Sequence, residues 1–223
     1  MDLHAKVLGL YCERVGEGFW DEPVNALTNL AFLLAAWLSW RVWREEPRAR
    51  GDRLTLVLIL LTAAIGLGSF AFHTFATRWA LLADTIPILI YMLTATGAIF
   101  RYGLGWSRLG VAALLVVFIA SMPTLMALLP PTRFQFSQGY WPAWFALVGA
   151  AWLVHAPDKR RHLTGTAGLF AISLVFRTLD RPLCPYAPFG THFLWHLFNA
   201  VVLFRVNTWL LYSRLDAAAG GAR

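Results

Sequence analysis

Two short polar patterns at the ends of apolar stretches carry the residue types of a catalytic site. Ser69 and His73 close one stretch, and Asp84 opens the next. Far along the chain, His192 and His196 repeat the four-residue spacing at the start of another apolar stretch. Residues four apart share one face of a helix. Because ionisable side chains are costly within such stretches, their presence indicates a functional site.

These residue types fit a zinc hydrolase. Three imidazoles with an open fourth position form a catalytic zinc site, and two histidines four apart on a helix commonly supply part of one. We therefore predict His73, His192 and His196 as zinc ligands. Zinc makes a water molecule nucleophilic at neutral pH, and Asp84 could take up its proton. Ser69 could donate to the developing oxyanion, although a small residue beside two glycines equally fits close helix packing.

The composition is that of a polytopic membrane protein. Of the 223 residues, 58% are hydrophobic and 14% are charged, and the mean hydropathy is +0.57. A soluble domain carries about 25% charged residues. The net charge of +7 comes largely from arginines in short loops, which is typical of orientation signals rather than of nucleic-acid binding. We predict one all-α integral-membrane domain over residues 1–223, with no nucleic-acid partner.

Seven stretches are apolar enough to cross a bilayer as helices, each of which needs about 20 mostly apolar residues. The predicted spans are Pro23–Val42, Leu54–Phe72, Trp79–Phe100, Leu109–Leu129, Tyr140–His155, Leu163–Leu179 and Thr191–Tyr212. Residues 1–22 would form an N-terminal segment outside the bilayer, and residues 213–223 a tail. The sequence thus predicts a seven-transmembrane helix bundle.

The distribution of Lys and Arg orients this bundle. The loops after the first, third and fifth spans, together with the tail and with Arg41 at the end of the first span, hold twelve of these residues, and the opposite side holds five. Because positively charged loops stay in the cytoplasm, we predict an outside N-terminus and a cytoplasmic C-terminus. The short loops and the preference for Arg over Lys favour a bacterial inner membrane.

This orientation gathers the polar residues in one layer near the outer face. Ser69 and His73 fall at the outer end of the second span, Asp84 about one turn deep in the third, and His192 and His196 in the first turns of the seventh. With a rise of about 1.5 Å per residue, their depths are similar. The zinc site would therefore face the extracytoplasmic side.

The same orientation places both cysteines outside. Cys12 precedes the first span, and Cys184 lies between the sixth and seventh. Because disulfides persist in oxidising compartments, we predict a Cys12–Cys184 bridge, with two free thiols as the alternative.

Other polar residues of the spans have structural explanations. Arg177 and Asp180, three apart on one predicted helix, fit an ion pair. Four asparagines fit interhelical hydrogen bonds, and these are Asn25, Asn29, Asn199 and Asn207.

Several motifs together resemble the alkaline ceramidase family, part of a wider group of seven-helix membrane hydrolases that includes progestin/adiponectin-type receptors and haemolysin III relatives. The motifs span nearly the whole chain in the family's order and are Tyr11-Cys12-Glu13, Glu22–Asn29, Gly68–His73, Leu82–Asp84 with Ile86–Ile88, and Gly190–His196 with Asn199. The resemblance implies that the three histidines bind zinc, that Asp84 contacts the zinc-bound water, that Ser69 supports the oxyanion and that the two cysteines pair. The implied reaction is hydrolysis of ceramide to sphingosine and a fatty acid, with the acyl chains held between helices.

One site implied by the resemblance matches only in part. Eukaryotic members of the family carry a calcium site in the N-terminal segment. Glu13 and Glu22 match two of its ligands and Tyr11 stands at a backbone-carbonyl position, but Leu10 and Val15 replace an expected Asp and Asn. Two carboxylates can attract calcium, which however takes six to eight oxygen ligands.

The sequence thus predicts a zinc-dependent membrane amidase that hydrolyses ceramide or a ceramide-like lipid amide within the bilayer. The alternative is a zinc-containing receptor of the related seven-helix group, without turnover and usually with the opposite orientation. A transporter has no support, because we find no inverted repeat. Side-chain chemistry does not discriminate among ceramide, N-acyl amino-acid lipids and other amides, and it indicates no oligomeric state.

Overall fold

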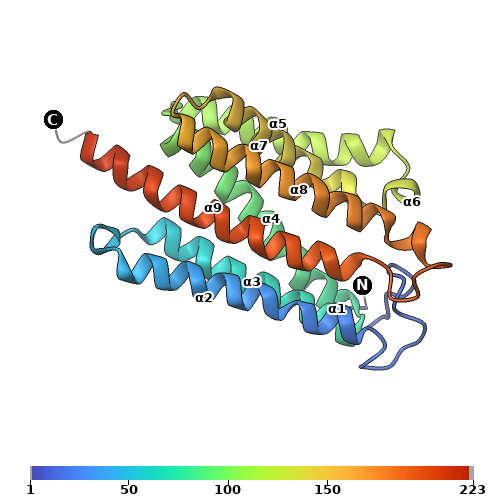
Figure 1. Ribbon diagram of the computed structural model, residues 1–223. Coiled ribbons are helices and arrows are strands. Elements are labelled where there is room, and N and C mark those ends of the chain that lie inside the picture. The colour runs from blue at the N-terminus through green and yellow to red at the C-terminus, as the bar shows by residue number, and fades with distance from the viewer. Residues whose placement is uncertain (1, 221–223) are drawn as a thin grey trace.

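The computed structural model is a bundle of helices (Figure 1). It describes residues 2–220, which contain no β-strand beyond an isolated antiparallel bridge between Lys6 and Thr77. The α-helices are α1 (Pro23–Thr28), α2 (Leu30–Glu45), α3 (Arg53–Phe75), α4 (Arg78–Ala98), α5 (Arg108–Leu128), α6 (Pro131–Phe134), α7 (Trp141–Leu153), α8 (Pro157–Leu183) and α9 (His192–Gly220). Short turns of other helix types are η1 (Pro47–Ala49), η2 (Ile99–Gly103) and η3 (Ser137–Tyr140). The all-α prediction is confirmed.

The helix boundaries differ from the predicted spans at both ends of the chain. The first span is divided at Asn29 into α1 and α2, where the side chains of Thr28 and Asn29 both bond to the carbonyl oxygen of Asn25. Such bonds compete with the regular helical pattern. α8 and α9 extend beyond their apolar residues, because a helix can continue into water, where its residues are polar and a hydropathy criterion does not detect them. α9 therefore takes up most of the predicted tail, and residues 221–223 lie outside the described residues.

Five helices are long and apolar enough to cross a membrane: Arg53–Phe75, Arg78–Gly103, Arg108–Leu128, Pro157–Leu183 and His192–Ala219. α2 has 16 residues and α7 has 13, so each is shorter than a typical span. These helices indicate a membrane protein. The count of seven spans and the orientation stay predictions.

α9 forms the axis of the bundle. It lies between the α2–α3 pair and the α7–α8 pair, and α4 packs on α3 (Figure 1). In the most apolar stretch of α9, 61% of the residues are buried, against 6% in α5 at the periphery. His192, Trp195 and His196 at the start of α9 are likewise buried, whereas α5 is the helix that a bilayer would cover.

Asparagine side chains link α9 to its neighbours. Asn207 bonds to side chains of α2, α3 and α4, and Asn199 bonds to α8. The interhelical role is confirmed for these two residues. It is wrong for Asn25, which donates to Glu22, and for Asn29, which donates to the Asn25 carbonyl, because the break between α1 and α2 supplies local partners.

The N-terminal segment, residues 2–22, covers one end of the bundle (Figure 1). It pairs through backbone hydrogen bonds with the turn between α3 and α4. The predicted disulfide between Cys12 and Cys184 is present, with Cα atoms 5.5 Å apart, and joins the segment to the end of α8. The segment is thus fixed over the helix ends from which the predicted site residues come.

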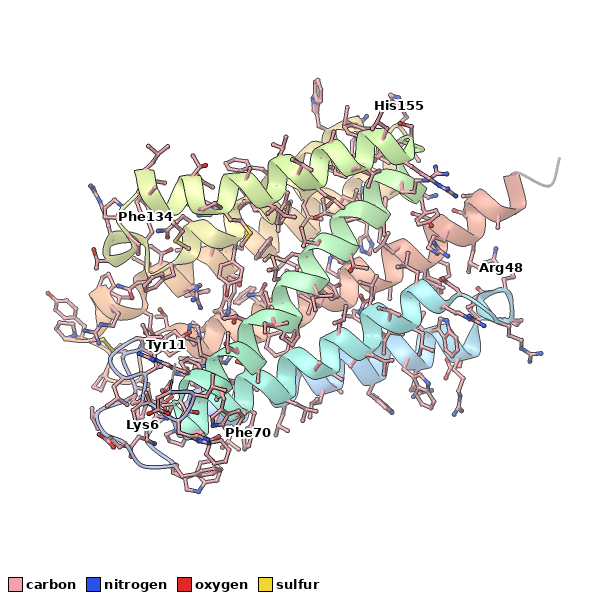
Figure 2. All side chains as sticks on the ribbon, turned by 180° about the vertical axis from the view of Figure 1, so that it is seen from behind. Lys6, Tyr11, Arg48, Phe70, Phe134 and His155 are labelled. Atoms are coloured by element: carbon pink, nitrogen blue, oxygen red, sulfur yellow. A yellow bond between two sulfur atoms is a disulfide. The ribbon has the colours of Figure 1, made fainter. Side chains whose placement is uncertain are left out.

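The two ends of the bundle carry the residues that the predicted topology assigns to opposite sides. Tyr11, Phe70 and Phe134 lie toward one end, and Arg48 and His155 lie toward the other (Figure 2). This separation is what alternating span directions require.

We expect the end covered by residues 2–22 to face the outside of the cell. Both native cysteines are paired, so a cysteine introduced at Val15, which is 93% exposed, would be a single free thiol. An impermeant thiol reagent should label Val15→Cys in intact cells and His155→Cys only after permeabilisation. The reverse pattern would establish the opposite orientation, that of the related receptors.

Candidate metal centre

The three predicted histidine ligands meet at the covered end of the bundle. His73 comes from the last turn of α3, and His192 and His196 come from the first turns of α9. Each residue is only 1% exposed. One ring nitrogen of each lies within 4.8 Å of the others, so the three side chains could hold a metal ion.

Neighbouring oxygens fix the orientation of two of these rings. Glu22 Oε2 lies 2.5 Å from Nδ1 of His73, and Thr28 Oγ1 lies 2.9 Å from Nδ1 of His196. Metal-binding histidines commonly use one ring nitrogen for the metal and the other for such a hydrogen bond. The arrangement leaves Nε2 of both rings for a metal ion. Neither Thr28 nor Glu22 was predicted in this role.

Unpartnered ring nitrogens support metal binding. Nδ1 of His192 and Nε2 of His196 are buried without a hydrogen-bond partner. A buried polar atom without a partner costs free energy, which a metal ion bound at that atom would offset. Imidazole nitrogens suit zinc and other late transition metals. The residues present therefore fit a metal ion held by nitrogen ligands.

Tyr11 closes the centre from the N-terminal segment. Its ring stacks on His192 with a centroid distance of 3.8 Å and lies 5.0 Å from the ring of His73. Burial raises the pKa of the Tyr11 phenol, so the hydroxyl stays protonated and able to donate a hydrogen bond. The family resemblance placed Tyr11 in a motif and at a carbonyl position of the implied calcium site, but nothing in the local sequence shows which distant ring it covers.

Asp180 holds the start of α9 in place. Its Oδ1 accepts the backbone N–H groups of positions 191 and 192, and its Oδ2 accepts that of Cys12. Among the described residues, no ion pair joins Asp180 to Arg177. The predicted pair is wrong, because this carboxylate caps a helix and binds the N-terminal segment instead. An added Cβ at Gly190, where φ is +62°, would collide with the same carboxylate.

We expect Asp180→Ala to destabilise the protein by about 3 kcal/mol, since a charged acceptor is lost and buried N–H groups remain without partners. The change should also lower metal binding, because it frees the turn that carries His192. Thermal unfolding in detergent and bound metal per chain measure the two effects. Asp158→Ala, at an exposed carboxylate in the first turn of α8, should change neither by much. An Asp180→Ala protein that unfolds at the same temperature as the wild type would contradict this role.

Ser69 and Asp84 line a small polar chamber together with both α9 histidines. Oδ1 of Asp84 is buried without a hydrogen-bond partner. A Cβ added at Gly68 would collide with the backbone carbonyl of Ala83, so the glycine permits the close approach of α3 and α4 here. This approach brings Ser69 and Asp84 to the chamber. All five residues of the predicted catalytic and zinc-binding set therefore lie together.

Two larger spaces adjoin the chamber. The first, the apolar cavity, lies between α2, α3, α4, α7, α8 and α9, and shares Phe32, Ile65 and Trp195 with the chamber. The second is a groove between the N-terminal segment, α4 and α5, and it shares Asp84 and Arg177 with the chamber. Most lining side chains of both spaces are apolar, as a lipid chain requires.

A sequence model of the ceramidase family matches residues 11–221, a region that holds every residue of the metal centre and the chamber. The chain belongs to the ceramidase family. Its members act on the amide bond of ceramide, and the chain is a hydrolase of this type. The comparison with curated proteins finds no match.

The N-terminal carboxylates of this ceramidase family member are bound by protein groups. Glu13 accepts two backbone N–H groups at the start of α1, and burial raises its pKa. Glu22 contacts His73 and accepts a hydrogen bond from Nε of Arg14 at 2.5 Å. Burial alone would raise the pKa of Glu22, but the contacts with His73 and Arg14 hold it below its usual range.

The positive charge beside Glu22 comes from the chain itself. The Arg14 guanidinium also donates to the carbonyl oxygens of Gly16, Gly18 and His73. Calcium takes six to eight oxygen ligands, and the carboxylate oxygens of Glu13 and Glu22 already have partners within the protein. As they lie, Glu13 and Glu22 therefore do not fit the calcium site that the family resemblance implied, and Glu22 instead orients His73.

Proposed function

We propose that the chain is a zinc-dependent integral-membrane amidase that hydrolyses ceramide, or a ceramide-like lipid amide, to a free sphingoid amine and a fatty acid. The observation that carries the proposal is the buried histidine triad beside a polar chamber that adjoins an apolar cavity. Membership of the ceramidase family supports the reaction type.

The donor set favours zinc as the metal. His73, His192 and His196 would hold it through three ring nitrogens, the ligand number of catalytic zinc sites that keep one position open. When bound, zinc stabilises negative charge on a carbonyl oxygen and lowers the pKa of a water molecule. Glu22 and Thr28 keep two of the imidazoles in the orientation that metal binding requires.

Asp84 and Ser69 supply the remaining chemistry. Asp84 has a free carboxylate oxygen in the chamber, where it can accept a proton from the attacking water and pass it to the leaving amine. The Ser69 hydroxyl lines the same chamber and can donate to the carbonyl oxygen as its negative charge develops. Water thereby adds to the carbonyl carbon, the C–N bond breaks, and the amine leaves with the transferred proton.

The two larger spaces fit the two halves of the substrate. The acyl chain would lie in the apolar cavity, and the hydrocarbon part of the amine half would lie in the groove beside α4 and α5, hereafter the substrate groove. The amide would then sit at the chamber between them. We further propose that the site faces the extracytoplasmic side of a bacterial inner membrane, as the charge distribution predicts.

The test is product analysis by mass spectrometry after the purified protein meets a panel of lipid amides. We expect ceramide to yield a sphingoid base and a fatty acid, a zinc chelator to stop the reaction, and added zinc to restore it. An amide-free ether analogue of ceramide controls for carried-over lipid. Zinc-loaded protein that binds these lipids without releasing product would favour the receptor alternative instead.

A further inference from the structure

Arg177 is a buried cation without a carboxylate partner. It lies on α8, is 8% exposed, and its Nε atom has no hydrogen-bond partner. No ion pair of the described residues includes it. A charged side chain at such a position is costly unless a partner compensates it, and within spans such residues commonly mark ligand sites.

Aromatic rings surround the Arg177 guanidinium. Its central carbon lies 5.0 Å from the ring centre of Tyr140, 5.1 Å from that of Trp195 and 5.9 Å from that of Tyr11. Aromatic faces attract a cation, and the hydroxyl oxygens of Tyr11 and Tyr140 can accept from some of the five N–H donors of the guanidinium. The rings therefore hold the cation in place, while its Nε atom stays without a partner and available to a ligand.

Other arginines inside the protein differ from Arg177 in this respect. Arg205, half-buried on α9, donates to Thr166 Oγ1 and to the carbonyl of His162. Arg14 donates to Glu22 and to backbone carbonyls. The fold thus provides hydrogen-bond acceptors for arginines with a structural role, whereas the Nε atom of Arg177 has none.

The position of Arg177 points to a ligand of the catalytic site. It lines both the polar chamber and the substrate groove, so it stands where the two spaces meet. Among the lining residues of these spaces, Asp84 is the one carboxylate, and it is not in ion-pair contact with Arg177. A molecule that fills the groove next to the amide would place its own polar group within reach of the guanidinium.

We propose that Arg177 is an anion-binding residue that receives a lipid carboxylate at the junction of the chamber and the substrate groove. The planar guanidinium fork matches a carboxylate in two parallel hydrogen bonds. The inference rests on the proposed amidase function, because the carboxylate belongs either to the amine half of the substrate, as in an N-acyl amino acid, or to the released fatty acid. In both cases Arg177 would bind a carboxylate through the same pair of hydrogen bonds.

The first experiment compares N-oleoylglycine with N-oleoylethanolamine as substrates of the zinc-loaded protein. The two compounds have the same acyl chain, but N-oleoylglycine ends in a carboxylate where N-oleoylethanolamine has a hydroxymethyl group. If the substrate carries the anion, kcat/KM should favour N-oleoylglycine by about tenfold or more, mainly through KM. Arg177→Met should bring the ratio close to one, and Arg205→Met should leave it unchanged.

The second experiment compares oleate with the neutral oleyl alcohol as ligands, by inhibition and by the shift in unfolding temperature. If the released acid is the ligand, oleate should bind about tenfold more tightly to the wild type, and Arg177→Met should abolish the difference. A difference in either experiment that Arg177→Met removes supports the proposal and identifies the source of the carboxylate. A wild-type protein without any preference for the acid, or a preference that survives in Arg177→Met, overturns it.

A second variant and a binding measurement distinguish failure of the anion site from failure of the amidase proposal. Arg177→Lys retains the charge but not the fork, so it should reduce the preference and serves if Arg177→Met does not fold. The unfolding shifts need no turnover. A protein that hydrolyses no lipid amide yet shows Arg177-dependent stabilisation by oleate would contradict the amidase proposal and support the anion site. A protein that hydrolyses lipid amides but shows no Arg177-dependent preference for the acid would support the amidase proposal and contradict the anion site.

Discussion

Replacing His196 with Ala is expected to abolish both zinc binding and ceramide hydrolysis. The imidazole is buried, its Nδ1 is held by Thr28, and its Nε2 has no partner within the protein. Loss of this ring removes one of three nitrogen ligands and leaves a pair that binds zinc more weakly. We expect turnover to fall by more than about 100-fold, beyond the range that loss of an outer contact to a ligand gives. Elemental analysis of bound zinc and release of sphingoid base measure the two losses.

Two variants make this result specific. His162→Ala removes a half-buried histidine that bonds to the Arg205 carbonyl, outside the metal centre, and should keep full zinc content and activity. Thr28→Val keeps the shape of the side chain and removes the oxygen beside His196, so it should weaken zinc binding by about 10- to 100-fold. Full activity of His196→Ala would remove the metal mechanism altogether.

The sequence was sufficient for the parts of the site that local spacing and span direction determine. His192 and His196 share a helix face because they are four apart, and Ser69 and His73 do so for the same reason. The charge bias then placed these helix ends in one layer. The three-dimensional arrangement agrees, since those residues and Asp84 lie together at one end of the bundle.

The contacts that support the ligands could not be predicted, because they join residues far apart in the chain. Thr28 lies beside His196, and Asp180 binds the N–H of Cys12. Asp180 is three residues from Arg177, so a local pairing rule suggested an ion pair. The rule considers only one helix, whereas all three N–H groups that bind Asp180 lie in other segments.

The predicted positions of the helix ends also differed from the structure. Hydropathy marks the apolar part of a helix, so α8 and α9 extend beyond the predicted spans. The division at Asn29 depends on hydrogen bonds of polar side chains, which an average over 20 or so residues does not resolve. This division matters for the site, since α1 carries Thr28 to its place beside His196.

Replacing Asp84 with Asn is expected to separate catalysis from metal binding. The residue lines the chamber but is not one of the three side chains that could hold the metal. Asn has nearly the same size, so the chamber should keep its shape, but the amide cannot accept and pass on a proton as a carboxylate does. Loss of a general acid–base group costs about 10²- to 10⁴-fold in rate. We expect a fall of this size in ceramide hydrolysis with the zinc content of the wild type.

The pattern across variants distinguishes this role from a structural one. Ser69→Ala, which removes a hydroxyl that lines the same chamber, should reduce turnover by about 10²- to 10³-fold if the hydroxyl stabilises the oxyanion, and hardly at all if Ser69 only eases helix packing. Asp84→Asn should lower kcat in both cases, because proton transfer does not depend on that hydroxyl. If Asp84→Asn instead lost its zinc, or if its kcat stayed unchanged, Asp84 would serve the metal centre or the fold. The proton would then have to travel through another group of the chamber, and the Tyr11 hydroxyl is the next group to test.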